Sequence, residues 1–245
     1  MSKIASITKT AGAVGVALMA LTGGALAEEF TWSVNAAGTS DYVFRGVSQS
    51  DEDPAFQAGI DASYGIVYAG IWGSSVDSEF IGGSPAEVDL YAGVKPVLGP
   101  ATFDFGVIYY WYPGEENQPL EQDYVELKAG VSGTFIPNLS TGFNLYWTDD
   151  GTLESGEYFV YEGNAGYTLP AVGIFTPSIS GVLGYLDHQE DDTLSYTYWN
   201  AGISLAVEKF TLDFRYWDTD TTVAGPSGND LADERFVFTA KVVLP

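Results

Sequence analysis

Hydrophobic and polar residues alternate with a period of two along most of this chain. This is the pattern of β-strands that have one apolar face and one polar face. Between residues 101 and 112, for example, Phe103, Phe105 and Val107 fall on one side of the expected strand and Asp104 falls on the other. The pattern therefore predicts an all-β protein.

Twelve segments carry this alternation. Most are about ten residues long, which matches the ~9–11 residues of a tilted strand that crosses a bilayer. The predicted strands are 30–46, 55–64, 66–76, 87–96, 101–112, 123–134, 140–148, 157–168, 175–186, 195–207, 209–218 and 234–244.

The connections between these segments alternate in length. The long connections are 47–54, 77–86, 113–122, 149–156, 187–194 and 219–233, and the short ones are Gly65, 97–100, 136–139, 169–174 and 208–209. Outer-membrane barrels have short periplasmic turns and long extracellular loops. We therefore expect residues 28–245 to form a transmembrane antiparallel up-and-down β-barrel of about 12 strands in a bacterial outer membrane, with both termini periplasmic.

Residues 1–27 resemble a secretory signal peptide. Lys3 and Lys9 precede an apolar run at 11–21, and Ala25-Leu26-Ala27 matches the small-x-small cleavage pattern. The alternative is a membrane-anchoring helix, but this run is shorter than the roughly 20 apolar residues that span a bilayer. A cleaved signal peptide is therefore expected.

Composition narrows the class further. Without the two lysines of the leader, 33 acidic residues face seven basic ones, a net charge of −26. Nucleic acid is excluded as a partner because phosphate binding needs clustered Lys and Arg. The chain has no cysteine, so no disulfide or thiolate site is possible.

The alternation also predicts which charged side chains point into the barrel. Six of the seven mature basic residues fall on the inward face, and the lipid face receives almost no charge, as the cost of a charge facing lipid requires. The candidate pore-lining residues are Asp41, Arg45, Asp61, Asp89, Asp104, Glu126, Lys128, Glu162, Asp213 and Arg215; Glu87, Lys95, Arg235 and Lys241 share that face. Two interpretations stay open: a narrow water-filled pore, and a lumen filled by ion-paired side chains.

Aromatic residues near the strand ends are candidates for the outward face. Trp and Tyr rings favour the headgroup region of a membrane, although aromatics are common in all strands. The candidates are Trp32, Tyr42, Phe44, Trp111, Trp147, Tyr167, Trp199 and Tyr216.

The expected external loops are acidic, with runs such as Asp51-Glu52-Asp53 and Glu190-Asp191-Asp192, and also Glu115-Glu116. Such a mouth concentrates cations and can hold divalent ions loosely through carboxylates. None of the runs has the spacing of a calcium-binding loop, so no specific metal site and no cofactor are predicted.

No catalytic residues are predicted, and we expect no enzyme activity. The one histidine, His188, falls in an expected polar loop, where an exposed side chain is the common case. No hydrolase elbow, zinc motif or phosphate-binding loop occurs.

One stretch resembles a known family. Ser40-Asp41-Tyr42-Val43-Phe44-Arg45-Gly46-Val47-Ser48-Gln49-Ser50, with the chain on to about residue 95, is similar to the TorF-like family of proteobacterial proteins assigned as porins. The resemblance implies an outer-membrane barrel and supplies no substrate. In this motif we expect Arg45 and Asp41 to face the lumen, Tyr42 and Phe44 to face lipid, and Arg45 to be the principal cation of the lumen, paired with Asp41 or Asp61.

The leading hypothesis is a channel for passive diffusion of small ions or solutes that prefers cations. The alternative is a non-conducting structural or surface-binding barrel whose acidic loops meet partners. The expected surroundings are outer-membrane lipid and lipopolysaccharide.

Overall fold

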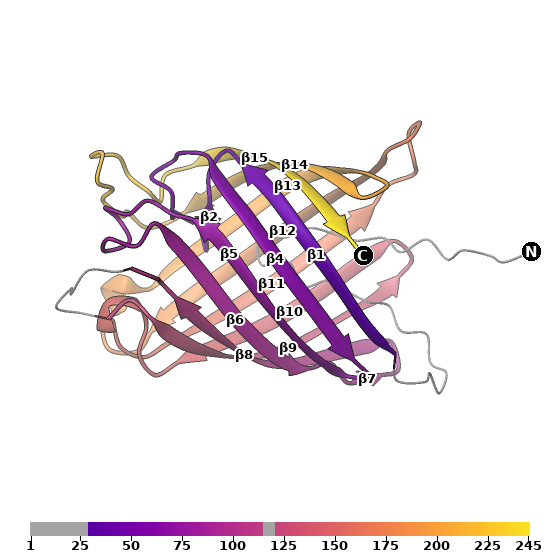
Figure 1. Ribbon diagram of the computed structural model, residues 1–245, viewed down its shortest axis with the longest axis horizontal. Helices are drawn as coiled ribbons and strands as arrows, with labels where there is room; N and C mark the ends of the chain where they lie inside the picture. The colour runs from indigo at the N-terminus through magenta and orange to yellow at the C-terminus, as the bar shows by residue number, and fades with distance from the viewer. Residues whose placement is uncertain (1–28, 115–120) are drawn as a thin grey trace, which may run out of the picture.

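A computed structural model describes residues 29–114 and 121–245 and has the form of a barrel (Figure 1). The predicted signal peptide lies outside the described residues. The twelve long strands are β1 (Phe30–Thr39), β4 (Ala55–Tyr64), β5 (Val67–Ser75), β6 (Ala86–Val94), β8 (Ala101–Trp111), β9 (Tyr124–Ile136), β10 (Leu139–Thr148), β11 (Tyr158–Thr168), β12 (Thr176–His188), β13 (Tyr196–Val207), β14 (Phe210–Thr219) and β15 (Arg235–Leu244).

Five short elements complete the described chain. They are the strands β2 (Val43–Phe44), β3 (Val47–Ser48) and β7 (Val97–Leu98) and the 3-10 turns η1 (Thr152–Glu154) and η2 (Asp192–Leu194). Within the described ranges, no helix is long and apolar enough to cross a membrane.

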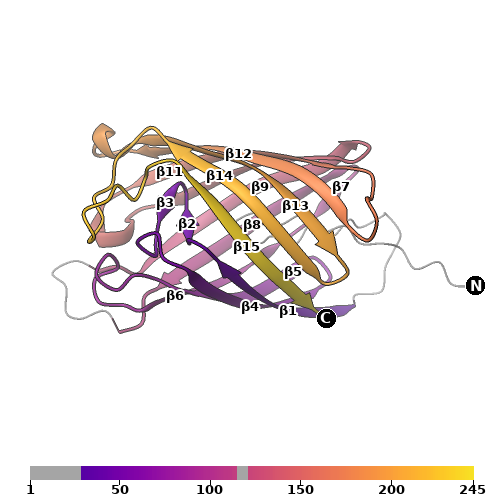
Figure 2. The same cartoon turned by 90° about the horizontal axis from the view of Figure 1, so that it is seen from above.

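The sheet closes on itself. Each long strand pairs antiparallel with the long strands before and after it in the chain, and β1 pairs with β15 from Val34↔Leu244 to Thr39↔Thr239. A hydrogen bond of 2.9 Å between the Thr39 and Thr239 hydroxyls adds to this seam. The predicted antiparallel up-and-down barrel of 12 strands is therefore confirmed (Figures 1 and 2).

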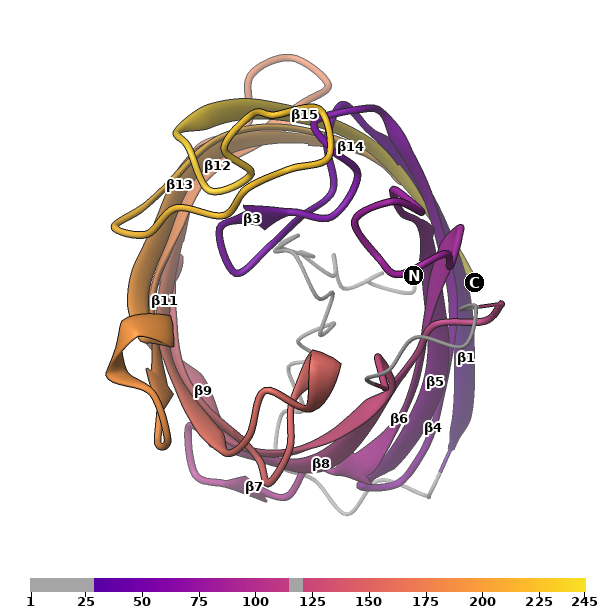
Figure 3. The same cartoon turned by 90° about the vertical axis from the view of Figure 1, so that its left-hand side faces the viewer.

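The predicted strand limits agree with the observed ones within about two residues, with one exception. The first strand was expected over 30–46, but β1 ends at Thr39. The chain then leaves the wall, and residues 40–54 carry the separate β2–β3 hairpin. Figure 3, an end-on view, shows this segment inside the ring of strands.

The connections alternate in length as predicted, except that 169–175 and 189–195 are equally long because β12 extends further than expected. The long ones are 40–54, 76–85, 112–123, 149–157, 189–195 and 220–234, and the short ones are 65–66, 95–100, 137–138, 169–175 and 208–209. Because every strand reverses direction, all long connections lie at one end of the barrel, called here the long-loop end. The other end is called the short-turn end.

The outward face is apolar. Large side chains on neighbouring strands are exposed at alternate positions, including Leu183, Ile203 and Phe214, and Phe214 lies 4.9 Å from the ring of Phe238. Soluble proteins rarely expose a continuous apolar surface of this extent. The belt is the surface expected of strands that face lipid.

Most of the proposed outward aromatics do point out. Trp32, Trp111, Tyr167 and Trp199 are exposed, and Tyr216 is half-buried against exposed Phe236. The half-buried Trp147 donates a hydrogen bond to Glu157. The prediction is wrong for Tyr42 and Phe44, which belong to the inward segment 40–54 and not to the wall.

A charge on this belt should destabilise the barrel according to its depth. We expect Ile203→Arg, near the middle of β13, to lower the free energy of unfolding in lipid vesicles by about 2–4 kcal/mol. Phe56→Arg, at the long-loop end of β4, should cost about 0–1 kcal/mol. Urea titration followed by tryptophan fluorescence measures both, and equal losses would contradict the assignment of this face to lipid.

Candidate functional site

The lumen contains a hairpin built from the motif that the sequence singled out. Strands β2 and β3 pair through Val43↔Ser48 and Phe44↔Val47, so only Arg45 and Gly46 form the turn. Both have positive φ, +49° at Arg45 and +87° at Gly46, as a two-residue hairpin turn of this type needs. A Cβ on Gly46 would lie 2.2 Å from Cγ2 of Thr219, so glycine is needed for space as well.

Arg45 at the tip of this hairpin binds Glu126 on β9. Its two terminal nitrogens donate to the two carboxylate oxygens at 2.6 and 2.8 Å. Both side chains are buried. The hydroxyls of Tyr110 and Tyr158 each donate to Glu126 at 3.0 Å. The prediction that Arg45 points into the lumen is confirmed, but its carboxylate partner is Glu126 and not Asp41 or Asp61.

Aromatic rings surround the same guanidinium. Its carbon lies 4.6 Å from the ring centre of Phe44 and 5.0 Å from that of Tyr146. Burial alone would lower the pKa of Arg45, but the charge and hydrogen bonds of Glu126, together with Tyr110 and Tyr158, raise it well above its ordinary value. Removing one partner of a buried pair leaves an uncompensated charge and costs about 3–5 kcal/mol.

The base of the hairpin is fixed by Asp41. Ser48 and Ser50 donate hydrogen bonds to one of its oxygens at 2.6 and 3.0 Å. Arg235, at the start of β15, donates to the other oxygen at 3.1 Å. Asp41 therefore ties the inward segment to itself and to the wall.

Tyr42 makes a second link to the wall. Its hydroxyl donates to Glu87 on β6 at 2.7 Å, and Tyr112 donates to the other oxygen of Glu87 at 3.1 Å. Burial, and after it the charge of Glu87, raises the pKa of Tyr42, so this phenol stays a donor. The prediction that Tyr42 faces lipid is wrong because β1 ends at Thr39, before the motif begins.

Two other long loops pack on the hairpin. The backbone of Ser48 donates to Leu231 at 2.8 Å, and Asp77 donates to the Gln49 carbonyl at 2.8 Å. Ile81 from loop 76–85 joins the buried apolar and tyrosine side chains in this half of the lumen. The hairpin and parts of two other long loops therefore lie in the long-loop half of the lumen and narrow it.

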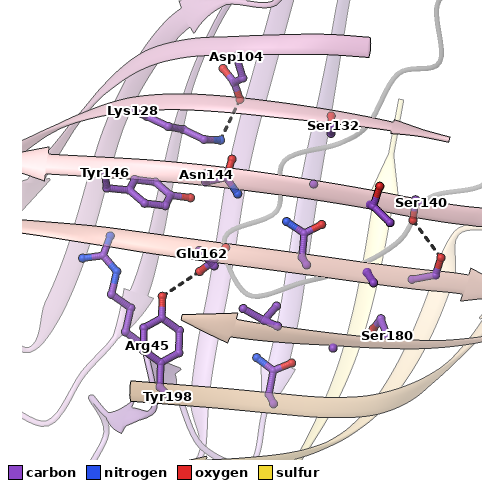
Figure 4. A pocket seen from close by; sticks show the side chains of 18 of the residues that line it. Arg45, Asp104, Lys128, Ser132, Ser140, Asn144, Tyr146, Glu162, Ser180 and Tyr198 are labelled. Carbon is purple, nitrogen blue, oxygen red and sulfur yellow. Dashed lines mark hydrogen bonds and ion pairs between the residues drawn. The ribbon is translucent and has the colours of Figure 1, made fainter. Parts of the chain in front are cut away.

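A second charged group lies on the wall around Asp104. Lys128 donates to Asp104 at 2.8 Å, Tyr68 donates to its other oxygen at 2.7 Å, and Lys95 lies 3.9 Å away. The ammonium of Lys95 also lies 4.1 Å from the ring centre of Tyr68. Figure 4 shows Lys128 reaching across to Asp104.

A third group is centred on Arg215 of β14. Its guanidinium donates twice to Asp213 at 3.0 Å and also to Asn200 and Ser180. Ser204 donates to Asp213 at 2.6 Å. Asp213 and Arg215 are neighbours on the inner face of β14, and they pair directly.

The other predicted lumen acids also point inward. Asp61 accepts from Tyr91 at 2.6 Å, and Glu162 accepts from Tyr198 at 3.0 Å. Asp89 is buried, and one of its oxygens has no hydrogen-bond partner among the described residues. All ten candidate residues thus lie on the inner side of the barrel, in several groups and not in one line.

A cavity of about 190 Å³ lies in the lumen below the hairpin tip. Its lining begins at Arg45 and Tyr146 and runs to Ser132 and Ser140, near the short-turn ends of β9 and β10 (Figure 4). This volume is more than ten times the about 10–15 Å³ that one ordered water needs. The lumen is therefore narrowed by the hairpin in one half and hollow in the other.

Sequence reasoning missed two classes of lining residue. One class is the tyrosines of the long-loop half, which donate hydrogen bonds to the charged groups or surround them: Tyr110, Tyr146, Tyr158 and Tyr198. Three asparagines, Asn144, Asn164 and Asn200, line the cavity. Both classes share the alternation of the charged residues, so that pattern contained the signal.

His188 differs from its prediction. It is the last residue of β12 and is buried, not exposed in a loop tip. Its Nδ1 accepts from the backbone of Asp191 at 3.2 Å, and its Nε2 has no partner within the part of the chain that is described. Because β12 is longer than predicted, the strand itself reaches this position.

The acidic loops form no metal-binding cluster among the described residues. Glu115 and Glu116, part of the predicted acidic set, lie outside those residues.

Three solved structures have a similar barrel. The chain matches the KdgM porin with a TM-score of 0.58 and 8% identity, and a KdgM porin in complex with disordered oligogalacturonate with a TM-score of 0.56 and 10% identity; each match covers 87% of this chain and 98% of the other. The NanC porin matches with a TM-score of 0.51 and 12% identity, over 87% of this chain and 98% of NanC. At these identities the likeness concerns the fold alone. No curated protein matches the sequence.

A family model also matches residues 24–243, which is nearly the whole chain. It carries a description other than the TorF-like one, so that resemblance stays a prediction. The chain belongs to the Gcw_chp family, described as bacterial proteins of unknown function.

Proposed function

We propose that this protein is an outer-membrane channel for passive diffusion of small solutes or ions, exported by the signal peptide at 1–27. The observation that carries the proposal is a closed barrel with an apolar outer face and a lumen that is lined by polar side chains and hollow toward the short-turn end. The fold shared with the KdgM and NanC porins supports it. Passage needs no catalytic step.

The path in this proposal runs through the lumen from end to end. In the long-loop half it passes the hairpin, so Arg45, Asp41, Asp89 and Glu126 line its narrow part. In the other half it crosses the cavity past Asp104, Lys128, Glu162, Asp213 and Arg215, with Asp61 on the opposite wall. Both termini are periplasmic, and the long loops are external.

The charge of the long loops favours cations. Arg45 is the one Lys or Arg in the six long connections, and it points inward. Acidic runs such as 51–53 and 190–192 surround the mouth, and a negative mouth raises the local concentration of cations. Cation preference is therefore part of the proposal.

A second candidate function is a non-conducting barrel whose acidic loops bind partners or divalent ions. The observation that favours it is the hairpin itself, which Asp41, Tyr42 and Arg45 tie to the wall. A permanently closed lumen would leave only the loop surface for function.

Planar-bilayer recordings under a KCl gradient should show discrete steps and a reversal potential that favours K⁺. The preference should shrink in concentrated salt, because the Debye length falls from about 10 Å at 0.1 M to about 3 Å at 1 M. Vesicle-refolded protein whose gel mobility changes on boiling is the starting material. Silence from folded, inserted protein would overturn the channel and favour the second function.

Weakening the bond between the hairpin and the wall should open the narrow half. We expect Glu126→Gln, which removes the charge opposite Arg45, to increase single-channel conductance at least twofold, because the hairpin tip then loses its charged anchor. Glu157→Gln is the matched control, since Glu157 lies outside the hairpin contacts and bonds Trp147.

A second variant tests the same mechanism without changing the wall. Gly46→Ala places a methyl group against Thr219 and disfavours the turn, so it should also raise conductance. Unchanged or smaller steps in both folded variants would show that the hairpin does not limit flow.

A further inference from the structure

The charged side chains around the cavity are already bound to protein partners. Lys128 is paired with Asp104, and Arg215 with Asp213, both within 3.0 Å. Arg45 is held by both oxygens of Glu126. A charged solute in the cavity would have to compete with these pairs, which buried hydrogen-bonded charges resist strongly.

Several uncharged polar side chains of the cavity wall, in contrast, have no protein partner among the described residues. The side-chain amides of Asn144 and Asn164 and the hydroxyls of Ser132 and Thr141 make no hydrogen bond with any other residue in ranges 29–114 and 121–245. All four are half-buried and line the cavity. An amide offers two donors and an acceptor, so this wall presents unused groups of both kinds.

Glycines on the neighbouring strands leave space for these two amides. Asn144 on β10 pairs with Gly130 of β9, and Asn164 on β11 pairs with Gly142 of β10. A Cβ on Gly130 would lie 2.5 Å from the side-chain oxygen of Asn144, and a Cβ on Gly142 would lie 3.0 Å from the amide of Asn164. The two amides therefore lie side by side on adjacent strands, Asn144 on β10 and Asn164 on β11.

Aromatic side chains border the same space. Tyr146, Tyr198 and Trp217 line the cavity toward the hairpin. Aromatic faces bury the apolar face of a ring-shaped solute, and amides and hydroxyls bind its hydroxyl groups. Figure 4 shows Asn144 and Tyr146 on adjacent parts of this wall.

We propose that the cavity is a binding site for an uncharged polyhydroxylated solute of sugar type, bound through Asn144 and Asn164. This inference rests on the proposed channel function and names the solute class of its lumen. The ion pairs of the wall are structural in this scheme. They hold Lys128 and Arg215 out of reach of an anionic solute.

Saturation-transfer NMR on the folded protein in detergent micelles tests the proposal with galactose and galacturonate, two sugars that differ by one carboxylate. Galactose should bind saturably, and galacturonate more weakly, at physiological salt. The double variant Asn144→Ala/Asn164→Ala should weaken galactose binding about tenfold, or about 1.4 kcal/mol, since it removes hydrogen bonds from both amides.

Asn35→Ala is the matched control, because Asn35 faces the lumen on β1 and does not line the cavity. It should bind galactose like the unaltered protein. Tighter binding of galacturonate, equal binding by the double variant, or absence of galactose binding would each overturn the inference.

The NMR readout does not depend on ion flow. Conductance without galactose binding would overturn this inference and leave the channel function intact. Galactose binding by a barrel that stays silent in bilayers would support the site and overturn the channel.

Discussion

The closed ladder of backbone hydrogen bonds is the constraint on which the rest of this structure depends. A bilayer offers no partners to backbone N–H and C=O groups, so a membrane sheet can have no free edge. Here the pairing of β1 with β15 joins the first and last strands and completes the ring. Once the ring is closed, every residue of the wall must face either lipid or lumen.

That division explains the placement of charge. Facing lipid, a charged side chain near the middle of the membrane costs about 2–4 kcal/mol for Lys or Arg, whereas the outward positions here carry Leu183, Ile203 and Phe214. Inside, a buried charge needs an opposite charge or hydrogen-bond donors beside it. Arg45 with Glu126, Lys128 with Asp104 and Arg215 with Asp213 satisfy this requirement on the wall.

Most of the wall could be predicted from the sequence, because both strand period and loop length are local properties. Eight of the ten candidate lumen residues lie on wall strands and follow from the same alternation; the other two, Asp41 and Arg45, belong to the inward segment. The hairpin could not be predicted in this way, since residues 40–46 also alternate and so looked like the end of a strand. These residues leave the wall because of contacts outside the strand pattern: Asp41 accepts a hydrogen bond from Ser48, and Arg45 pairs with Glu126, which is distant in the sequence. A turn with Arg45 and Gly46 at positive φ carries a weaker sequence signal than Asn-Gly.

The hairpin and the cavity divide the lumen into two parts with different chemistry. In the long-loop half, a buried ion pair and a set of tyrosines fix an inward segment. In the other half, the cavity wall carries polar groups such as the Asn144 amide and the Thr141 hydroxyl, which have no hydrogen-bond partner among the described residues. The acidic loops act on solutes over a distance of about 8 Å at physiological salt, whereas the amides act only on contact. In the proposed channel, selection by charge at the mouth and selection by hydrogen bonding in the cavity are thus separate steps. In these proposals, an uncharged solute with many hydroxyl groups is not repelled by the negative mouth and can form hydrogen bonds with the cavity wall, whereas small cations are concentrated by the mouth alone.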